Sequence, residues 1–143
     1  MGVPEAAEFR IPDEEFAARL ERVRASMAER GLDCLFVFSN ETDPSDVRYL
    51  SDYWPNFENA GVLVPAEGAA VLLIGPEAET YASSRSRIRE MRRLPQLAES
   101  AMPGYPGMHQ DRLADVINEV ADGRGFRRVG IVETTTRYAS RLP

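Results

Sequence analysis

Hydrophobic residues recur at helical spacing near the start of the chain and predict one long amphipathic helix. They share a helix face because each follows the last by three or four positions: Phe16, Leu20, Val23 and Met27. Asp13 is expected as the N-cap, since its carboxylate can accept hydrogen bonds from the first turn. Gly31 is expected to end the helix, because glycine adopts the left-handed conformation without steric cost. Leu32 would then fold back on Met27.

Five segments predict β-strands, at residues 33–39, 61–65, 70–74, 88–94 and 128–132. The first is apolar without alternation, which is typical of a strand that is covered on both faces. The second and third are joined by a turn near Gly68 and predict an antiparallel hairpin. The fourth alternates without a clean apolar face, and its charges suit the edge of a sheet.

Four shorter helical segments are predicted, at residues 45–50, 76–82, 108–121 and from 134 onward. Ser45 is expected to cap the first of them. Pro76 is expected to begin the second, because proline is favoured at the first position of a helix. Three of its side chains should face inward: Ala78, Tyr81 and Ala82. The third has an apolar face made of Leu113, Val116, Ile117 and Val120.

The order of these elements predicts an α/β fold. Strands interleaved with helices favour a three-layer α/β/α arrangement with a mixed, mostly parallel sheet that contains one antiparallel hairpin. Residues 1–11 are expected to form an N-terminal arm. Residues 12–143 are expected to form one domain, as a length of 143 residues favours.

The composition argues against several classes of partner and chemistry. The net charge of −6 argues against nucleic acid and anionic membranes as partners. No apolar run reaches the ~18 residues of a membrane span. The N-terminus is acidic and lacks the apolar segment of a signal peptide, so we expect a cytoplasmic location. All 17 basic residues are arginine, which excludes lysine chemistry such as a Schiff base.

No catalytic residue can be assigned within the chain. The one histidine, His109, and the one cysteine, Cys34, are too few and too far apart for a zinc site. Cys34 lies in an apolar strand, where burial raises a thiol pKa, and is interpreted as a core residue. His109 is interpreted as a surface residue, and no nucleophile elbow is present. We expect no catalytic residue, no metal ligand and no cofactor in this chain.

Two clusters of residues leave alternatives open. Tyr53, Trp54 and Phe57 flank Pro55 in a loop, and they either cover one end of the sheet or form the wall of a binding site. Five arginines lie within nine residues: Arg85, Arg87, Arg89, Arg92 and Arg93. They either bind a phosphate or carboxylate, or pair with acids of the same surface or of a partner subunit.

Three pieces of sequence, in their order along the chain, resemble the N-terminal domain of the creatinase, prolidase and aminopeptidase P family. They are EFAARLERVRASMAERGLDCLFVF, VRYLSDYWPNFENAGVLVP and GPEAETYA. The resemblance implies a ribonuclease H-like α/β/α domain, which in this family precedes a catalytic "pita-bread" domain. That second domain hydrolyses Xaa-Pro peptides or related C–N bonds, often with two divalent metals (Mn, Co or Zn). We expect it to lie outside this chain.

The resemblance also implies a role for the aromatic loop. In this family the N-terminal domain supports dimerisation and overhangs an active site. The residues expected at the substrate rim are therefore Tyr53, Trp54, Phe57, Glu58 and Asn59. Creatinase-like relatives carry an arginine after the aromatic residue, whereas this chain has Glu58 and Asn59 there. The difference argues against a creatine-like substrate, whose carboxylate would need a cation. The implied partners are the chain's own C-terminal catalytic domain, a second copy, and a peptide or small amide substrate.

Three hypotheses follow for function. The leading one is a non-catalytic N-terminal domain of an Xaa-Pro peptidase or creatinase-like hydrolase. The second is a peptide- or protein-binding module of a catalytically inactive relative. The third is an unrelated α/β domain that binds a small ligand. A downstream series of Asp, Asp, His, Glu and Glu would favour the first hypothesis, and its loss in a second domain would favour the second.

Overall fold

The computed structural model describes residues 10–98 and 106–132, and in these residues five strands form one sheet. The strands are β1 (Cys34–Ser39), β2 (Ala60–Pro65), β3 (Val71–Ile74), β4 (Met91–Arg93) and β5 (Val129–Val132). The helices are α1 (Asp13–Glu29), α2 (Ser45–Ser51), α3 (Glu79–Arg85), α4 (Leu113–Val120) and the 3-10 helix η1 (Pro95–Leu97). The strand order across the sheet is β4-β3-β2-β1-β5.

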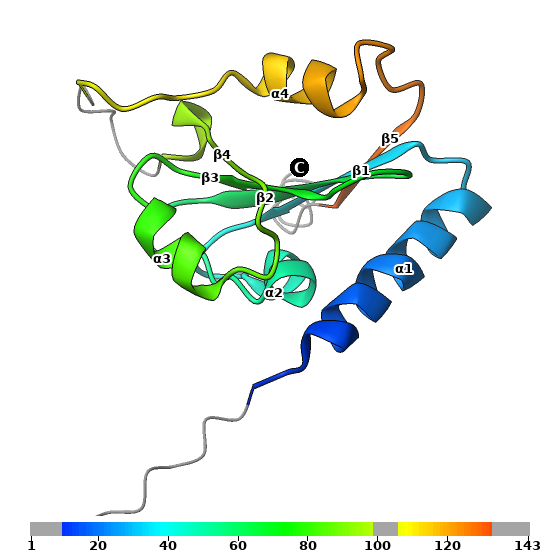
Figure 1. The fold of residues 1–143 in the computed structure, drawn as a ribbon, viewed down its shortest axis with the longest axis horizontal. Helices are drawn as coiled ribbons and strands as arrows, with labels where there is room; N and C mark the ends of the chain where they lie inside the picture. The colour runs from blue at the N-terminus through cyan, green and yellow to red at the C-terminus, as the bar shows by residue number, and fades with distance from the viewer. Residues whose placement is uncertain (1–9, 99–105, 133–143) are drawn as a thin grey trace, which may run out of the picture.

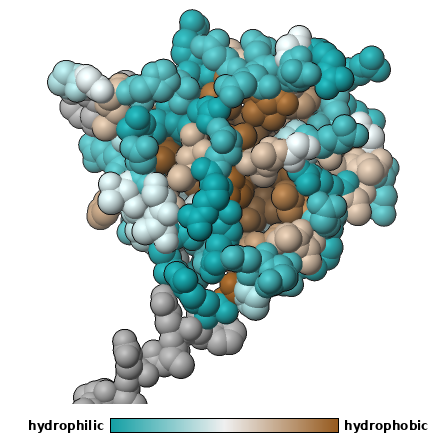
Figure 2. Space-filling model, viewed as in Figure 1, coloured by the Kyte–Doolittle hydropathy of each residue, from teal (hydrophilic) through white to brown (hydrophobic). Residues whose placement is uncertain are grey.

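Helices cover both faces of this sheet. Helices α1, α2 and α3 lie on one side of it and α4 on the other (Figure 1). Each face has its own hydrophobic core, and β1 contributes to both. Val37 belongs to the core on the first face, and Cys34 belongs to the core on the second. Figure 2 shows apolar surface in the middle of the molecule, between more hydrophilic outer parts. The three-layer α/β/α arrangement and the doubly covered first strand are therefore confirmed.

The sheet is mixed, as expected, but it is not mostly parallel. Strand β2 pairs antiparallel with both β1 and β3, whereas β5 pairs parallel with β1 and β4 pairs parallel with β3. The expected hairpin is β2–β3. The antiparallel pairing of β1 with β2 was not anticipated, and it follows from the connection between them. Ser39 at the end of β1 lies opposite Ala60 at the start of β2, so α2 and its loop return the chain to the same end of the sheet.

The end of α1 is the one the sequence predicts. Gly31 has a φ of 63°, its N–H donates to the carbonyl of Ala28 at 3.0 Å, and the Leu32 N–H donates to Met27 at 2.9 Å. These two bonds form a Schellman motif and satisfy carbonyls at the helix end. The start differs slightly, because Asp13 is the first helical residue and Pro12 occupies the N-cap position. Asp13 therefore lies in the first turn, where the helix dipole favours its charge.

Three shorter helices begin at other residues than predicted, and one side chain of α3 is more exposed than predicted. Ser45 is the first residue of α2 and not its cap, since Pro44 precedes the helix. Helix α3 begins at Glu79, because the segment from Pro76 forms a turn before it. Helix α4 begins at Leu113, five residues later than expected. Tyr81 was expected to face inward, but it is 41% exposed.

The remaining expectations for the chain have mixed outcomes. The edge strand is confirmed as β4, although it covers only Met91–Arg93. The last strand is confirmed as β5, which lies at the opposite edge. The helix expected from residue 134 and most of the N-terminal arm lie outside the described residues. Among the described helices, none combines the length and the apolar character that crossing a membrane requires.

The carboxylate of Asp33, just before β1, bonds the backbone just before β5. It accepts hydrogen bonds from the backbone N–H groups of Arg127 at 2.7 Å and Arg128 at 2.9 Å. The N–H of Asp33 in turn donates to the carbonyl of Arg128 at 3.1 Å. These N–H groups bond the charged form of the carboxylate, so the pKa of Asp33 is lowered from its ordinary value. Asp33 thereby sets the register with which β5 joins β1.

We predict that Asp33→Asn destabilises the protein, because an amide offers only one acceptor oxygen to the two N–H groups. Since the folded pKa is lowered, the carboxylate contributes stability above its ordinary value of 3.8, and that contribution is lost as the pH falls through the folded pKa. Urea unfolding should therefore separate variant and wild type at pH 7 and bring them together in acid. Glu67→Gln, in the exposed β2–β3 turn, is the control. A difference that does not change with pH would contradict this role.

Candidate functional site

Residues 52–59, between α2 and β2, form the loop in which the sequence places the substrate rim. The loop begins with Asp52 in the left-handed conformation at the end of α2, with a φ of 61°. From there the side chains separate. Tyr53 and Glu58 are buried, whereas Trp54 is 43% exposed and Phe57 is 74% exposed. The structure therefore does not place the five predicted rim residues on one surface.

Tyr53 lies beneath the loop, in the core on the α1–α3 side of the sheet. Its ring lies 5.7 Å from the ring of Tyr81, with the two planes inclined by 53°. Burial, together with the charge of Glu58, raises the pKa of Tyr53 to about 12, so its hydroxyl is neutral at pH 7. Among buried side-chain atoms of the described residues, this hydroxyl oxygen is the one that has no hydrogen-bond partner. A buried hydroxyl without a hydrogen-bond partner lowers the stability of the folded state by about 1–3 kcal/mol.

Glu58 connects the loop to the turn before α3. Its Oε2 accepts the backbone N–H of Glu77 at 3.1 Å. The carboxylate lies directly against the Cα of Gly75, and a β-carbon added at Gly75 would overlap it. Burial raises the pKa of Glu58, while the backbone N–H groups of Glu77 and Ala78 oppose that rise. Glu58 therefore anchors the loop of residues 52–59 to the turn before α3.

Phe57 and Trp54 are the aromatic residues of the loop that are exposed. Phe57 has a φ of 65°, and its N–H donates to Oε2 of Glu41 at 3.3 Å. A bulky residue is rare in this conformation, which costs on the order of 1–3 kcal/mol. The guanidinium of Arg48 lies 4.8 Å from the centre of the Trp54 ring, in a cation–π contact. The loop therefore holds a large apolar ring in solvent in spite of backbone strain.

Phe57 and Glu58 line two pockets. The first has a volume of about 260 Å³ and is completed by Asn40, Glu41, Thr42 and Asn59. The second, of about 190 Å³, is completed by Tyr53, Asn56, Glu77, Ala78 and Tyr81. Four of the five predicted rim residues thus line one or both pockets, and Trp54 lines neither. Sequence reasoning missed Tyr81, whose position in a helical pattern gave no sign of a pocket.

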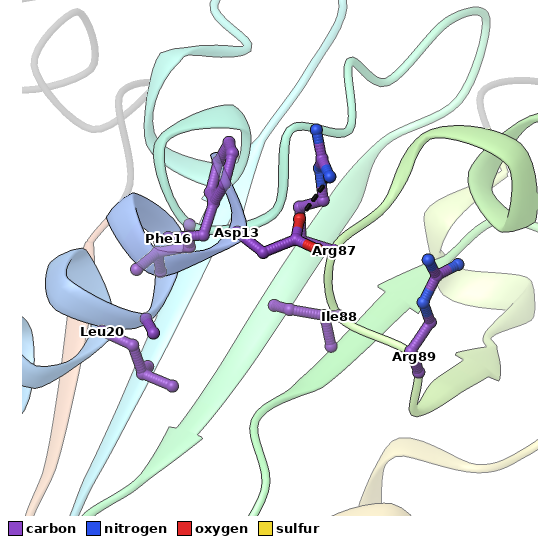
Figure 3. Close-up of a pocket in the computed structure, with 8 residues that line it drawn as sticks. Asp13, Phe16, Leu20, Arg87, Ile88 and Arg89 are labelled. Carbon is purple, nitrogen blue, oxygen red and sulfur yellow. Dashed lines mark hydrogen bonds and ion pairs between the residues drawn. The ribbon is translucent and has the colours of Figure 1, made fainter. Parts of the chain in front are cut away.

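A third pocket, of about 280 Å³, lies between α1, the end of α2 and the segment before β4 (Figure 3). Its apolar lining includes Phe16, Leu20 and Ile88. Arg87 borders it, forms an ion pair with Asp13, and donates to the carbonyl of Ile11 at 3.2 Å. Nothing in the sequence indicated this pocket, because its residues come from distant segments of the chain.

Three arginines of the cluster pair with acids of the same chain. Arg87 also contacts Asp52 at 3.4 Å, Arg93 contacts Glu79 at 2.7 Å, and Arg92 contacts Glu119 at 2.7 Å. Arg92 forms a further ion pair with Glu90. For these three arginines the expected pairing with acids of the same surface is confirmed.

The residues considered for chemistry occupy ordinary structural positions. Cys34 is buried in the core on the α4 side, and this burial raises the pKa of its thiol to about 11. The side chain of His109 is exposed and lies 3.2 Å from Asp111. Both interpretations made from the sequence are confirmed. Within residues 10–98 and 106–132, no group of three or more His, Cys, Asp or Glu residues could hold a metal ion.

Comparison with known proteins assigns the chain to a family. A family profile described as "Creatinase/Prolidase N-terminal domain" matches residues 19–142. The chain therefore belongs to the creatinase/prolidase N-terminal domain family. No curated protein matches the chain at a significant level.

Solved structures with TM-scores of 0.54 and 0.52 support the fold. The chain is similar to an Xaa-Pro aminopeptidase from Streptococcus pyogenes, with a TM-score of 0.54, 17% identity, and coverage of 91% of this chain and 85% of that one. It is similar to dipeptidase PepE from Mycobacterium ulcerans (TM-score 0.52, 16% identity, 94% of this chain), but spans only 38% of that protein. It is 30% identical to the N-terminal domain of the cytoplasmic peptidase PepQ from Mycobacterium tuberculosis, over 56% of this chain and 58% of that one, with a TM-score of 0.49.

The contact between Glu58 and Gly75 can be tested by a double-mutant cycle. We predict that Gly75→Ala lowers the free energy of unfolding by about 1–3 kcal/mol, because its methyl group overlaps the Glu58 carboxylate. In a Glu58→Ala background the same change should cost at least about 1 kcal/mol less. Glu58→Gln, which keeps the side-chain volume, is the matched control and should not relieve the overlap. Equal costs of Gly75→Ala in all three backgrounds would show that the contact is absent.

Proposed function

We propose that this chain is the non-catalytic N-terminal domain of an Xaa-Pro peptidase or a related hydrolase. The family match over residues 19–142 supports this proposal, as do similar structures that are named as an aminopeptidase and a dipeptidase. In the proposed arrangement a C-terminal domain performs hydrolysis, and two divalent metals (Mn, Co or Zn) would bind there. The described residues contribute no ligand cluster for such metals.

The loop of residues 52–59 is proposed to form part of the substrate rim of that enzyme. The observation that carries this proposal is Phe57, which is 74% exposed in a left-handed conformation. Fold stability alone would favour glycine at such a position and would not hold a phenyl ring in solvent. An exposed ring with few rotatable bonds suits contact with a proline ring or another apolar group of a peptide. Trp54 is proposed to extend this surface, with Asn59 beside it, and Tyr53 and Glu58 to support it from below.

The proposed rim can be tested by enzyme kinetics on the complete gene product, which in this proposal includes the catalytic domain. We predict that Phe57→Gly leaves the free energy of unfolding unchanged or raises it by up to about 1 kcal/mol, since backbone strain is relieved. The same variant should lower kcat/KM for Xaa-Pro peptides by about tenfold. Tyr49→Ala, which removes an exposed aromatic side chain of α2, is the control and should retain kcat/KM. The 143-residue chain alone should hydrolyse none of these peptides.

Two results would contradict these proposals. If Phe57→Gly keeps full kcat/KM, the ring does not contact substrate. If the complete gene product binds peptides but never hydrolyses them, the alternative of a binding module from an inactive relative is favoured.

We also propose that the domain takes part in a homodimer. Strand β5 lies at the edge of the described sheet, and three of its apolar residues are exposed: Val129, Ile131 and Val132. An exposed apolar edge strand is a ready surface for pairing with a second chain. Ile131, at 69% exposure, is the most accessible of the three.

The dimer can be measured by light scattering of the complete gene product. Ile131→Arg is expected to shift the mass from dimer toward monomer, because it places a charge in the proposed apolar contact. Arg124→Glu, which changes charge at an exposed position outside β5, is the control. A dimer that persists in Ile131→Arg would place the interface elsewhere.

A further inference from the structure

The pocket between the loop of residues 52–59 and the start of α3, which we call the α3 pocket, combines aromatic and acidic walls. Its lining includes the aromatic residues Tyr53, Phe57 and Tyr81 and the carboxylates Glu58 and Glu77. The rings of Tyr53 and Tyr81 lie 5.7 Å apart at an inclination of 53°, so they form two walls that meet at an angle. The α3 pocket therefore places aromatic side chains and carboxylates on one lining.

We propose that the α3 pocket binds a primary ammonium group that carries a small apolar body. The proposal concerns this chain by itself and holds whether or not the chain belongs to a peptidase.

The first argument comes from hydrogen bonding. Tyr53 lines the pocket, and its buried hydroxyl has no hydrogen-bond partner among the described residues. Glu58 accepts the Glu77 N–H at 3.1 Å, yet an ionised carboxylate can accept about four hydrogen bonds. A primary ammonium group is a compact donor of three N–H bonds. It can therefore supply the partner that Tyr53 lacks and fill the remaining acceptor capacity of Glu58.

The second argument comes from charge. Glu58 is a buried carboxylate whose partners are backbone N–H groups, and among the described residues it forms no ion pair with a positively charged side chain. A bound cation would compensate its charge in surroundings of low dielectric constant. Cations are also attracted to the faces of aromatic rings within about 6 Å of the ring centre. The net charge of −6 adds a long-range attraction for a cationic ligand.

Other classes of ligand fit the α3 pocket less well. Anions would be repelled by the Glu58 carboxylate. A calcium or magnesium ion needs about six oxygen ligands, and no suitable group of three acidic, histidine or cysteine side chains exists among the residues described. A neutral apolar molecule would leave the Glu58 charge without compensation. The volume of about 190 Å³ suits a group of several non-hydrogen atoms, larger than a few waters and smaller than a folded peptide.

Titration of the 143-residue chain with n-butylammonium chloride, followed by NMR at constant ionic strength, tests the proposal. We expect saturable shifts of the Tyr53 and Tyr81 ring signals, with a dissociation constant in the range of about 1–10 mM. Butan-1-ol has a similar shape without the charge, and it should give no saturable shift over the same range. No saturation by butylammonium up to about 50 mM, or equal binding of butan-1-ol, would overturn the proposal.

Three variants show whether these side chains carry the binding. Glu58→Gln keeps an acceptor for the Glu77 N–H, and it should weaken butylammonium binding at least about tenfold. Tyr81→Leu changes a side chain that is 41% exposed, so the fold is expected to persist while binding weakens about threefold. Glu119→Gln removes the same charge from α4, on the opposite face of the sheet, and serves as the matched control. Unchanged affinity in both Glu58→Gln and Tyr81→Leu would overturn the assignment.

Tyr53→Phe separates a binding role from a structural one. It removes a buried hydroxyl that has no partner, so the melting temperature should stay equal or rise. Binding of butylammonium should nevertheless fall several-fold, because one acceptor is lost. A purely structural hydroxyl would leave the affinity unchanged, and that result would remove Tyr53 from the site.

A last comparison identifies the source of the ammonium group. A dipeptide amide with a free amino terminus is titrated against its N-acetylated form. If only the free form binds, the α3 pocket accepts peptide amino termini. If neither dipeptide binds while butylammonium does, the ammonium site stands and its ligands are small amines. Because no step requires hydrolysis, failure here is distinguishable from failure of the proposed peptidase role.

Discussion

The contact of the Glu58 carboxylate with the backbone before α3 is the constraint on which the candidate site depends. Glu58 can lie there only because position 75 is glycine, and it accepts an N–H of the turn that leads into α3. This contact fixes the far end of the loop of residues 52–59 against the sheet. With that end held, Tyr53 is enclosed on the inside and Phe57 is left on the outside. This buried carboxylate and the left-handed residues Asp52 and Phe57 together hold the loop in the shape that separates its aromatic rings.

The parts of the fold that the sequence predicts well are those determined by local spacing. Helix α1 was predictable because its apolar residues follow the helical repeat and Gly31 ends it with a positive φ. The central strands were predictable because their apolar runs are continuous or bounded by turn residues. In each case the residues that determine the element lie within it or next to it.

The errors occur where a distant residue determines local structure. Pro76 and the acids after it resemble the start of a helix, but the turn there is held by Glu58, 19 positions earlier than Glu77. Helix α4 begins late because the Asp111 N–H donates to the carbonyl of Arg93, which keeps the preceding segment extended. The aromatic residues of the candidate site were identified from composition alone. Their division into buried and exposed was not predictable, because the left-handed conformations at Asp52 and Phe57 involve no glycine.

The bond between Asp33 and Arg128 joins residues that are 95 positions apart. During synthesis at roughly 5–20 residues per second, this separation corresponds to about 5–20 s between the two ends of the bond. The β2–β3 hairpin can form early from neighbouring residues, whereas the outer edge of β1 has to wait for β5. Through that interval the unpaired N–H and C=O groups of β1 are available to other chains. During synthesis β1 is therefore an unprotected edge, whereas in the finished molecule it is paired on both sides.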